Sequence, residues 1–314
     1  MRLLLLGCTG FVGRELVPRL LAAGHQLTLV SRRPHSGKGL PAWTAQVDWV
    51  QLDPSDTTSW QKESLLKAVQ TAEGVVNLAG EPIAEQRWTP QHLQTIESSR
   101  LRTTSLLVEA MARMDAPPQV LVNASAVGFY GTSSELEFNE TSPSGDDFLA
   151  GLCSSWEAAA QARPDATRLL VVRIGIVLGP DGGALGKMLP IFRAGFGGPL
   201  GTGRQWMSWI HRTDLCRLIE QALIDQSWSG VVNGVGPQPV TMAMFARTLG
   251  MSLGRPSLLP VPGAILMMLL GDGARVVLEG QRVVSQRLSQ QLGFSFRYPD
   301  LVEALADLTG SKAQ

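Results

Sequence analysis

The chain has 314 residues with 27 basic and 27 acidic side chains, so its formal net charge at pH 7 is zero. This balance offers no basic excess for nucleic acid or for an anionic membrane surface, and a small-molecule partner is the better expectation. The three cysteines lie far apart and form no C-x-x-C pair, so we expect no metal site and a reducing compartment.

The chain begins directly with a strand, and its N-terminus does not resemble a signal peptide. The longest apolar run, Ala264 to Leu270, is far shorter than the roughly 20 residues that cross a bilayer. We therefore expect a cytoplasmic protein with no integral membrane span.

The first thirty residues predict a strand, a glycine-rich turn, a helix and a second strand. Residues 2–6 are an apolar run suited to a strand buried on both faces of a parallel sheet, and residues 26–31 form the next strand. The turn between them carries Gly7, Gly10 and Gly13. Backbone N–H groups and the positive helix end can hold a pyrophosphate there. A tight turn in a protein that binds no nucleotide is the alternative, and the position of the turn favours the nucleotide.

The end of the second strand indicates which dinucleotide is bound. An NAD site normally offers an acidic residue to the ribose 2′-hydroxyl, whereas this chain reads Ser31-Arg32-Arg33. Two guanidinium groups suit a 2′-phosphate, so we expect NADP(H). The alternative is that the arginines are a solvated loop edge.

The spacing G-x-x-G-x-x-G resembles the extended, epimerase-like branch of the short-chain dehydrogenase/reductase superfamily. Later segments carry the same resemblance: Asn77-Leu78-Ala79-Gly80, the strand ending at Ser125, Arg173 to Pro180, and Trp209-Ile210-His211. The resemblance covers essentially the whole chain and implies an α/β fold with a Rossmann-type doubly wound parallel sheet. It places the NADP-binding domain in residues 1–178, with a later strand near 231–236 returning to it, and a smaller C-terminal α/β substrate lobe in 179–314.

The resemblance also implies which residues contact the cofactor. They come from the glycine turn, the two strand ends that follow it, the helix over 91–114 and the strand before Gly179: Gly7, Thr9, Gly10, Phe11, Val12, Gly13, Ser31, Arg32, Arg33, Asp53, Leu78, Ala79, Gly80, Arg100, Ile176 and Val177. Asp53 has an equally good interpretation as a turn residue, and Arg100 as a solvated surface arginine.

The catalytic residues are the least regular part of the resemblance. Ser125 matches the superfamily's catalytic serine, which would polarise a substrate C–O group. The usual acid/base pair is Tyr with Lys four residues later, but the matching helix has Leu149 and Cys153 at those positions. Tyr130 is the preferred replacement proton donor, with a packed aromatic as the alternative.

Five further residues are candidates for contacting the substrate, all but the first from the second half of the chain: Glu81, Arg173, Lys187, Trp209 and His211. The alternatives are an ion pair for Arg173, solvation for Lys187, and core packing for Trp209 and His211.

The absence of the Tyr/Lys pair, together with motifs such as Asn77-Leu78-Ala79-Gly80 and Trp209-Ile210-His211, resembles the atypical group called short-chain dehydrogenase/reductase family 39U. This implies a nucleotide-binding, epimerase/dehydratase-like oxidoreductase that uses NADP(H) on an unidentified small carbonyl or hydroxyl substrate. A catalytically impaired NADP(H)-binding regulator that engages a protein partner is the alternative. A conventional sugar-nucleotide epimerase is the weakest hypothesis, because it needs the missing tyrosine and usually holds NAD.

Overall fold

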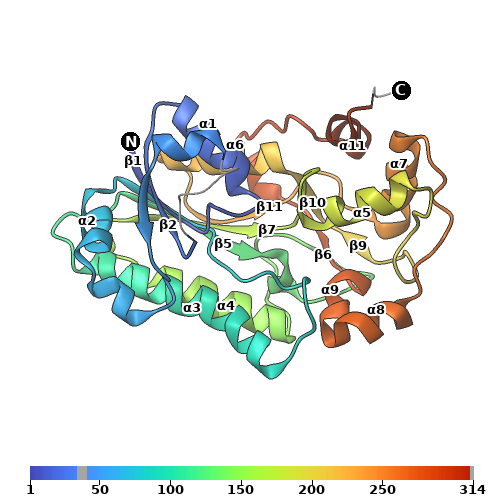
Figure 1. Ribbon diagram of the computed structural model, residues 1–314, viewed down its shortest axis with the longest axis horizontal. Coiled ribbons are helices and arrows are strands. Elements are labelled where there is room, and N and C mark those ends of the chain that lie inside the picture. The colour runs from blue at the N-terminus through green and yellow to red at the C-terminus, as the bar shows by residue number, and fades with distance from the viewer. Residues whose placement is uncertain (34–40, 312–314) are drawn as a thin grey trace.

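A computed structural model describes residues 1–33 and 41–311, and its centre is a seven-stranded parallel sheet (Figure 1). The strands lie in the order β11-β7-β5-β4-β1-β2-β3. Their bounds are β1 Arg2–Leu6, β2 Gln26–Ser31, β3 Asp48–Gln51, β4 Gly74–Asn77, β5 Val120–Ala126, β7 Arg168–Ile174 and β11 Gly230–Gly234. The predicted doubly wound α/β fold is confirmed, because the chain adds β2 and β3 on one side of β1, then returns to place β4 on its other side, and helices cover both faces.

Helices cover the two faces of the sheet and explain why β1 is apolar throughout. Leu3 and Leu5 pack in one core cluster with helices α1 and α6, while Leu4 and Leu6 pack in a second cluster with α2 and α3. Side chains alternate between the faces of a strand, so a strand covered on both sides needs apolar residues at every position. These helices and α4 are bounded as follows: α1 Gly13–Ala22, α2 Glu63–Thr71, α3 Pro90–Ala112, α4 Phe148–Gln161 and α6 Arg212–Ile224.

A smaller set of elements lies beside the carboxyl ends of the sheet strands (Figure 1). Its short strands pair as β8 Ile176–Leu178 with β10 Trp209–His211, β9 Trp206–Met207 with β12 Val240–Thr241, and β6 Glu137–Phe138 with β13 Arg282–Val283. Its helices are α5 Gly183–Arg193, α7 Met242–Leu253, α8 Gly263–Leu270, α9 Arg275–Leu278, α10 Gln286–Gln290 and α11 Leu301–Thr309. A separate core cluster joins α5, α7 and α11, so this part has its own apolar interior.

Strand register brings the predicted motifs to one edge of the sheet. Asn77 at the end of β4 is paired with Leu6 on one side and with Asn123 of β5 on the other, and Ser125 of β5 is paired with Arg173 of β7. In parallel sheets ligands bind at the carboxyl ends of the strands, where the order reverses. The sequence motifs are therefore neighbours in space at this edge.

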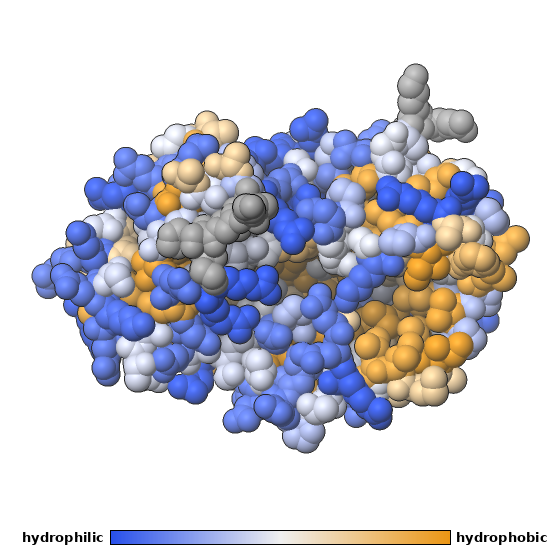
Figure 2. Space-filling model, in the orientation of Figure 1, coloured by the Kyte–Doolittle hydropathy of each residue, from blue (hydrophilic) through white to orange (hydrophobic). Residues whose placement is uncertain are grey.

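Helix α8 is apolar yet exposed, and it forms an orange area at the right of Figure 2. Six residues of this segment and the chain before it make up the exposed apolar patch: Leu258, Leu259, Ile265, Met267, Met268 and Leu269. Within residues 1–33 and 41–311, no helix combines the length and apolar character that a membrane span requires.

Asp214 ties helix α6 to the C-terminal segment. The N-cap of α6 is His211, whose Nδ1 accepts from the Thr213 backbone N–H at 3.1 Å. Asp214 is fully buried, and its carboxylate accepts from the backbone N–H groups of Arg297 and Tyr298 at 2.8 and 2.9 Å. It also pairs with Arg217 at 2.9 Å, so the buried charge is fully satisfied.

Replacing Asp214 by Ala should lower the free energy of unfolding by about 3–5 kcal/mol, because two buried N–H groups and one arginine lose their acceptor. Urea unfolding followed by circular dichroism measures this. Asp225→Ala is the matched control, because that partly exposed carboxylate accepts from the Ser227 backbone N–H and hydroxyl in a local turn, at 2.9 and 2.7 Å. Equal losses in the two variants would contradict the role given to Asp214.

Candidate functional site

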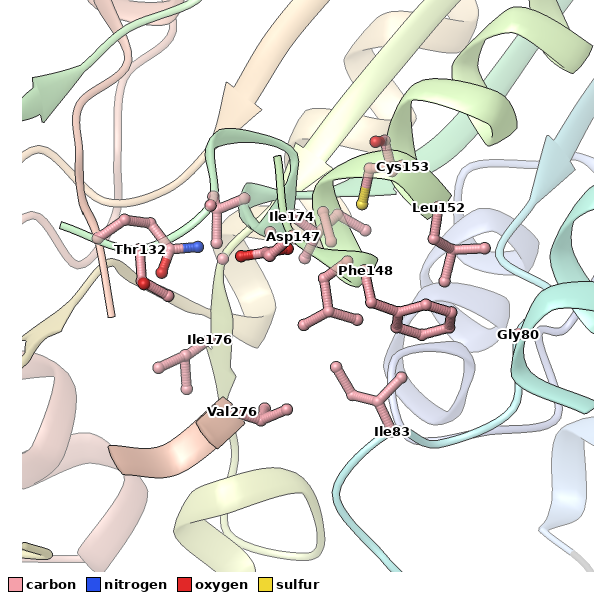
Figure 3. Close-up of a pocket in the computed structure, with 18 of the residues that line it drawn as sticks. Gly80, Ile83, Thr132, Asp147, Phe148, Leu152, Cys153, Ile174, Ile176 and Val276 are labelled. Carbon is pink, nitrogen blue, oxygen red and sulfur yellow. The ribbon is translucent and has the colours of Figure 1, made fainter. Parts of the chain in front are cut away.

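A cavity of about 540 Å³ lies between the sheet edge and the smaller set of elements. The carboxyl ends of β4, β5 and β7 form one wall with residues 78–80, 124–126 and 174–176. The loop over 83–88, the start of α4 and the segment around α9 form the other walls (Figure 3). Its position at the reversal point of the sheet makes it the candidate active site.

The predicted glycine turn has the geometry of a phosphate cradle. Gly7 has a φ of +75°, and a Cβ on Gly13 would lie 1.8 Å from the carbonyl oxygen of Cys8, so neither position accepts a side chain. A Cβ on Gly10 would meet only the Gly7 carbonyl oxygen, at 3.5 Å, so the turn is open on that side. No side chain caps the N-terminus of α1, so no side chain competes with an anion for the positive end of that helix. The cradle therefore fits a dinucleotide pyrophosphate.

Phe11 and Val12 connect the cradle to the rest of the site. Val12 lines the cavity. A Cβ added to Gly179, Gly182 or Gly183 would lie within 3.0 Å of the Phe11 ring, so that ring packs against this glycine cluster. Thr9 is exposed beside it at the tip of the turn.

The end of β2 presents two exposed arginines. Ser31 is buried and its Oγ accepts from the Arg33 backbone N–H at 3.1 Å. The Arg32 guanidinium lies 3.6 Å from the Glu81 carboxylate. Glu81 was expected to contact the substrate, but its carboxylate pairs with Arg32 at the edge of β2, and it does not line the cavity. Asp53 accepts from the backbone N–H and hydroxyl of Ser55 at 2.9 and 2.8 Å, which matches its alternative as a turn residue.

Arg100 lines the cavity from helix α3. Its guanidinium donates to the backbone oxygens of Glu81 and Ile96, each at 3.0 Å, and lies 5.3 Å from the ring centroid of Trp156. A Cβ on Gly80 would come within 3.0 Å of it, so the absence of a side chain at Gly80 leaves room for the guanidinium. Arg100 is thus a fixed cation in the cavity wall.

Ser125 lies in a buried polar network that the sequence did not predict in full. Its hydroxyl donates to the Glu157 carboxylate at 2.6 Å. Arg173 holds that carboxylate with two bonds, from Nε and Nη2, each 2.8 Å long. All three residues are buried, at most 7% exposed, so the charges can persist there only because they are paired. Arg173 thus forms the ion pair that was its alternative to substrate contact, with Glu157 as its partner, and it does not line the cavity.

Tyr130 is bound within the same network, and this corrects its expected role as proton donor. Its hydroxyl donates to Asn233 Oδ1 at 2.7 Å and accepts from Arg173 at 3.0 Å. The side chain is 3% exposed, it lies outside the cavity lining, and burial raises the pKa of its phenol. A hydroxyl enclosed in this way cannot reach a substrate in the cavity.

Leu149 and Cys153 line the cavity at the positions where the resemblance would place the tyrosine and the lysine. A Cβ on Gly128 would lie 3.3 Å from Leu149 Cβ and 4.0 Å from Cys153 Sγ, so both pack against the turn after β5. Burial raises the pKa of the Cys153 thiol to about 11, so the thiol is neutral at pH 7. Neither residue can take the place of a phenol and an ammonium group.

The structure also places five more of the predicted residues. Trp209 is a core residue, 1% exposed, and its Nε1 donates to the Gln238 carbonyl oxygen at 2.9 Å. His211 caps α6, and burial lowers its pKa. Lys187 is exposed and contacts the Ala84 carbonyl oxygen at 3.3 Å. Ile176 lines the cavity, whereas Val177 packs against the core.

Sequence reasoning missed Glu157 and most of the outer cavity wall. Glu157 follows Cys153 by four residues and so shares its helix face, a spacing that would have identified it. The outer wall comes from segments with no common motif, and it includes Ile83, Trp88, Thr132, Asp147, Phe148, Leu152, Trp206, Arg275, Val276, Glu279 and Gln281. Only the folded chain brings these segments together.

The buried cysteines predict the thiol chemistry of the native protein. Cys8, Cys153 and Cys216 are all buried, and burial raises the pKa of each thiol, to about 12 for Cys8. Since the thiolate is the reactive form, Ellman's reagent at pH 7.5 should label the native protein slowly and label all three thiols after denaturation in guanidinium. Rapid labelling of Cys153 in the native protein would contradict this environment.

Comparisons with known proteins agree with this geometry. The model of the NAD dependent epimerase/dehydratase family matches residues 3–233, and a domain of unknown function, DUF1731, matches residues 261–308. The human epimerase family protein SDR39U1 is 40% identical over 312 residues, which is 98% of this chain and 99% of the relative. A chloroplastic SDR39U1 homologue from Arabidopsis thaliana is 45% identical over 302 residues, or 95% of this chain and 84% of that protein.

Solved structures show the same fold. The crystal structure of human SDR39U1 (isoform 2) with NADPH superposes with a TM-score of 0.88 at 39% identity, covering 99% of this chain and 100% of that one. A nucleoside-diphosphate sugar epimerase from Corynebacterium glutamicum gives 0.74 at 30% identity, covering 99% of this chain and 58% of that one. The chain thus belongs to the NAD dependent epimerase/dehydratase family and, within it, to the group of SDR39U1 proteins.

Proposed function

We propose that the protein is an NADP(H)-dependent oxidoreductase that acts on a small carbonyl or hydroxyl substrate. The observation that carries this proposal is the continuity of the site: the glycine turn leads through Val12 and residues 78–80 into the cavity that holds Ser125. A dinucleotide bound on the turn would extend its nicotinamide end toward this serine. That arrangement suits hydride transfer to or from a group beside Ser125.

The choice of NADP(H) rests on the end of β2. Arg32 and Arg33 are exposed there, so both can contact a 2′-phosphate. Strand β2 carries no acidic side chain that would repel that phosphate. Arg32 is held near the site by Glu81 at 3.6 Å. The NADPH in the human relative's crystal structure supports the same choice.

Ser125 is the catalytic residue in this proposal, with Glu157 and Arg173 as positioning residues. When bound, NADP(H) would supply or accept the hydride. Because the Ser125 hydrogen is directed to Glu157, the lone pairs of its oxygen are left to accept a hydrogen bond from a substrate hydroxyl. A proton leaving that hydroxyl can pass through Ser125 to the Glu157 carboxylate, and it returns by the same route when a carbonyl is reduced. Arg173 keeps Glu157 in place throughout.

A cofactor-binding regulator is the second candidate, and the apolar and thiol side chains of Leu149 and Cys153 favour it. Such a protein would bind NADP(H) without hydride transfer and engage a protein partner. A cytoplasmic location is also part of the proposal, on the sequence features given above; the Arabidopsis relative's name places that protein in the chloroplast.

Replacing Arg32 and Arg33 together by Ala should weaken NADPH binding about 10²- to 10⁴-fold, since each of the two charge-assisted bonds contributes about 1.5–3 kcal/mol. NADH binding should change far less, because NADH lacks the 2′-phosphate. Titration of cofactor fluorescence measures both affinities. Arg113→Ala, at the exposed end of α3, is the control. An equal loss for NADPH and NADH would refute the assignment.

NADPH deuterated at its transferable position should pass the label to a metabolite in a cell extract, read by mass spectrometry. Ser125→Ala should lower the labelling rate about 10²- to 10⁴-fold while NADPH binding is retained. The purified protein without extract is the blank. If NADPH binds and no label moves, the regulator is the better account and the oxidoreductase is excluded.

A further inference from the structure

One side of the cavity's outer half is lined by apolar side chains. Beyond the cofactor end, side chains from four separate segments face a common space (Figure 3). Ile83 and Trp88 come from the loop after β4, Phe148 and Leu152 from α4, Ile176 from β8 and Val276 from α9. A site that recognised a sugar would instead be expected to place many hydrogen-bonding groups here.

Phe148 is the residue that most clearly indicates an apolar ligand. Its side chain is 40% exposed even though it lies in a concave site, and its ring packs edge-on against Trp88 with 5.5 Å between centroids. A large apolar surface that the protein itself leaves uncovered inside a cavity is a typical ligand contact. The two rings give a flat apolar or aromatic group a surface on which to pack.

The charges in the cavity do not suit an anion. In the part of the chain that the structure describes, its charged lining residues are two arginines and three acids: Arg100, Arg275, Asp146, Asp147 and Glu279. Arg100 lies toward the cofactor end with two backbone partners, and Arg275 lies 3.9 Å from Glu279. Lys187, the basic residue that the sequence suggested for an anionic substrate, pairs with Glu85 at 3.8 Å outside the cavity. A diphosphate would meet a net negative wall.

A few uncharged polar groups remain in the outer half. Thr132 and Gln281 line it, and the Thr132 hydroxyl lies 3.3 Å from Glu279. They can bind one or two polar atoms of a ligand and set its orientation.

Resting on the proposed function, we propose that the substrate is an uncharged, predominantly apolar or aromatic ketone, aldehyde or alcohol. Nucleotide diphosphate sugars are then not substrates of this protein. The apolar group lies between Phe148, Ile83 and Val276, and the reacting C–O group points to Ser125.

The test uses Prodan, an uncharged naphthyl ketone whose emission shifts to the blue in apolar surroundings, titrated into the full-length protein saturated with NADP⁺. We expect saturable binding that millimolar UDP-glucose does not displace. Val276→Glu should weaken Prodan binding at least 10-fold with NADP⁺ affinity retained. Met268→Glu, on the exposed apolar patch, should leave Prodan binding unchanged and serves as the matched control.

Three results would overturn the proposal: no saturable Prodan binding, displacement by UDP-glucose, or an unchanged affinity in Val276→Glu. If Val276→Glu does not fold, as judged by circular dichroism, Phe148→Ser gives the same test at a partly exposed position. Cofactor affinity and hydride transfer are measured separately. A failure of the oxidoreductase function is therefore distinguishable from a failure of the substrate class.

Discussion

The buried pair of Glu157 and Arg173 is the interaction on which the site depends. It joins helix α4 to strand β7, and through Ser125 and Tyr130 it also reaches β5 and β11. Two charges removed from water cost several kcal/mol each, and the bidentate geometry offsets that cost only while both partners stay in place. The same pair that fastens the helix to the sheet therefore also determines where the Ser125 hydrogen points.

Glu157 shares its helix with the two positions where the resemblance would place the superfamily's tyrosine and lysine. Leu149, Cys153 and Glu157 are spaced by four residues, so they share one face of α4. The first two line the cavity and are uncharged, while the third carries the ionic group one turn further into the interior. At the positions where the resemblance would place a phenol and an ammonium group, this helix face carries uncharged side chains, and the carboxylate that binds Ser125 follows one turn later. Arg100 supplies a cation to the cavity wall, and its guanidinium lies 5.3 Å from the ring centroid of Trp156 on the same helix α4.

The fold and the cofactor end could be predicted because local rules determine them. Gly7 and Gly13 leave no room for a side chain, and strand register carries Asn77 and Ser125 to the same edge. The roles of Tyr130 and His211 could not be predicted, because residue type does not tell whether a polar side chain faces a cavity or satisfies a buried partner. The outer wall of the cavity could not be predicted for another reason: its residues, such as Trp88 and Val276, are distant in sequence and belong to no common motif.

A single loop serves both ends of the site. Its first residue, Glu81, pairs with Arg32 at the position proposed for the 2′-phosphate, and its later residues Ile83 and Trp88 form the apolar wall. The indole N–H of Trp88 donates to the Ile83 carbonyl oxygen at 2.7 Å, so a hydrogen bond within the loop fixes this end of it. A Cβ on Gly273 would lie 2.9 Å from the Trp88 ring, so the segment before α9 packs closely against this loop. If Arg32 binds the 2′-phosphate as proposed, it would leave Glu81, the residue from which the apolar wall begins, so this loop would connect the cofactor end of the site to its substrate end.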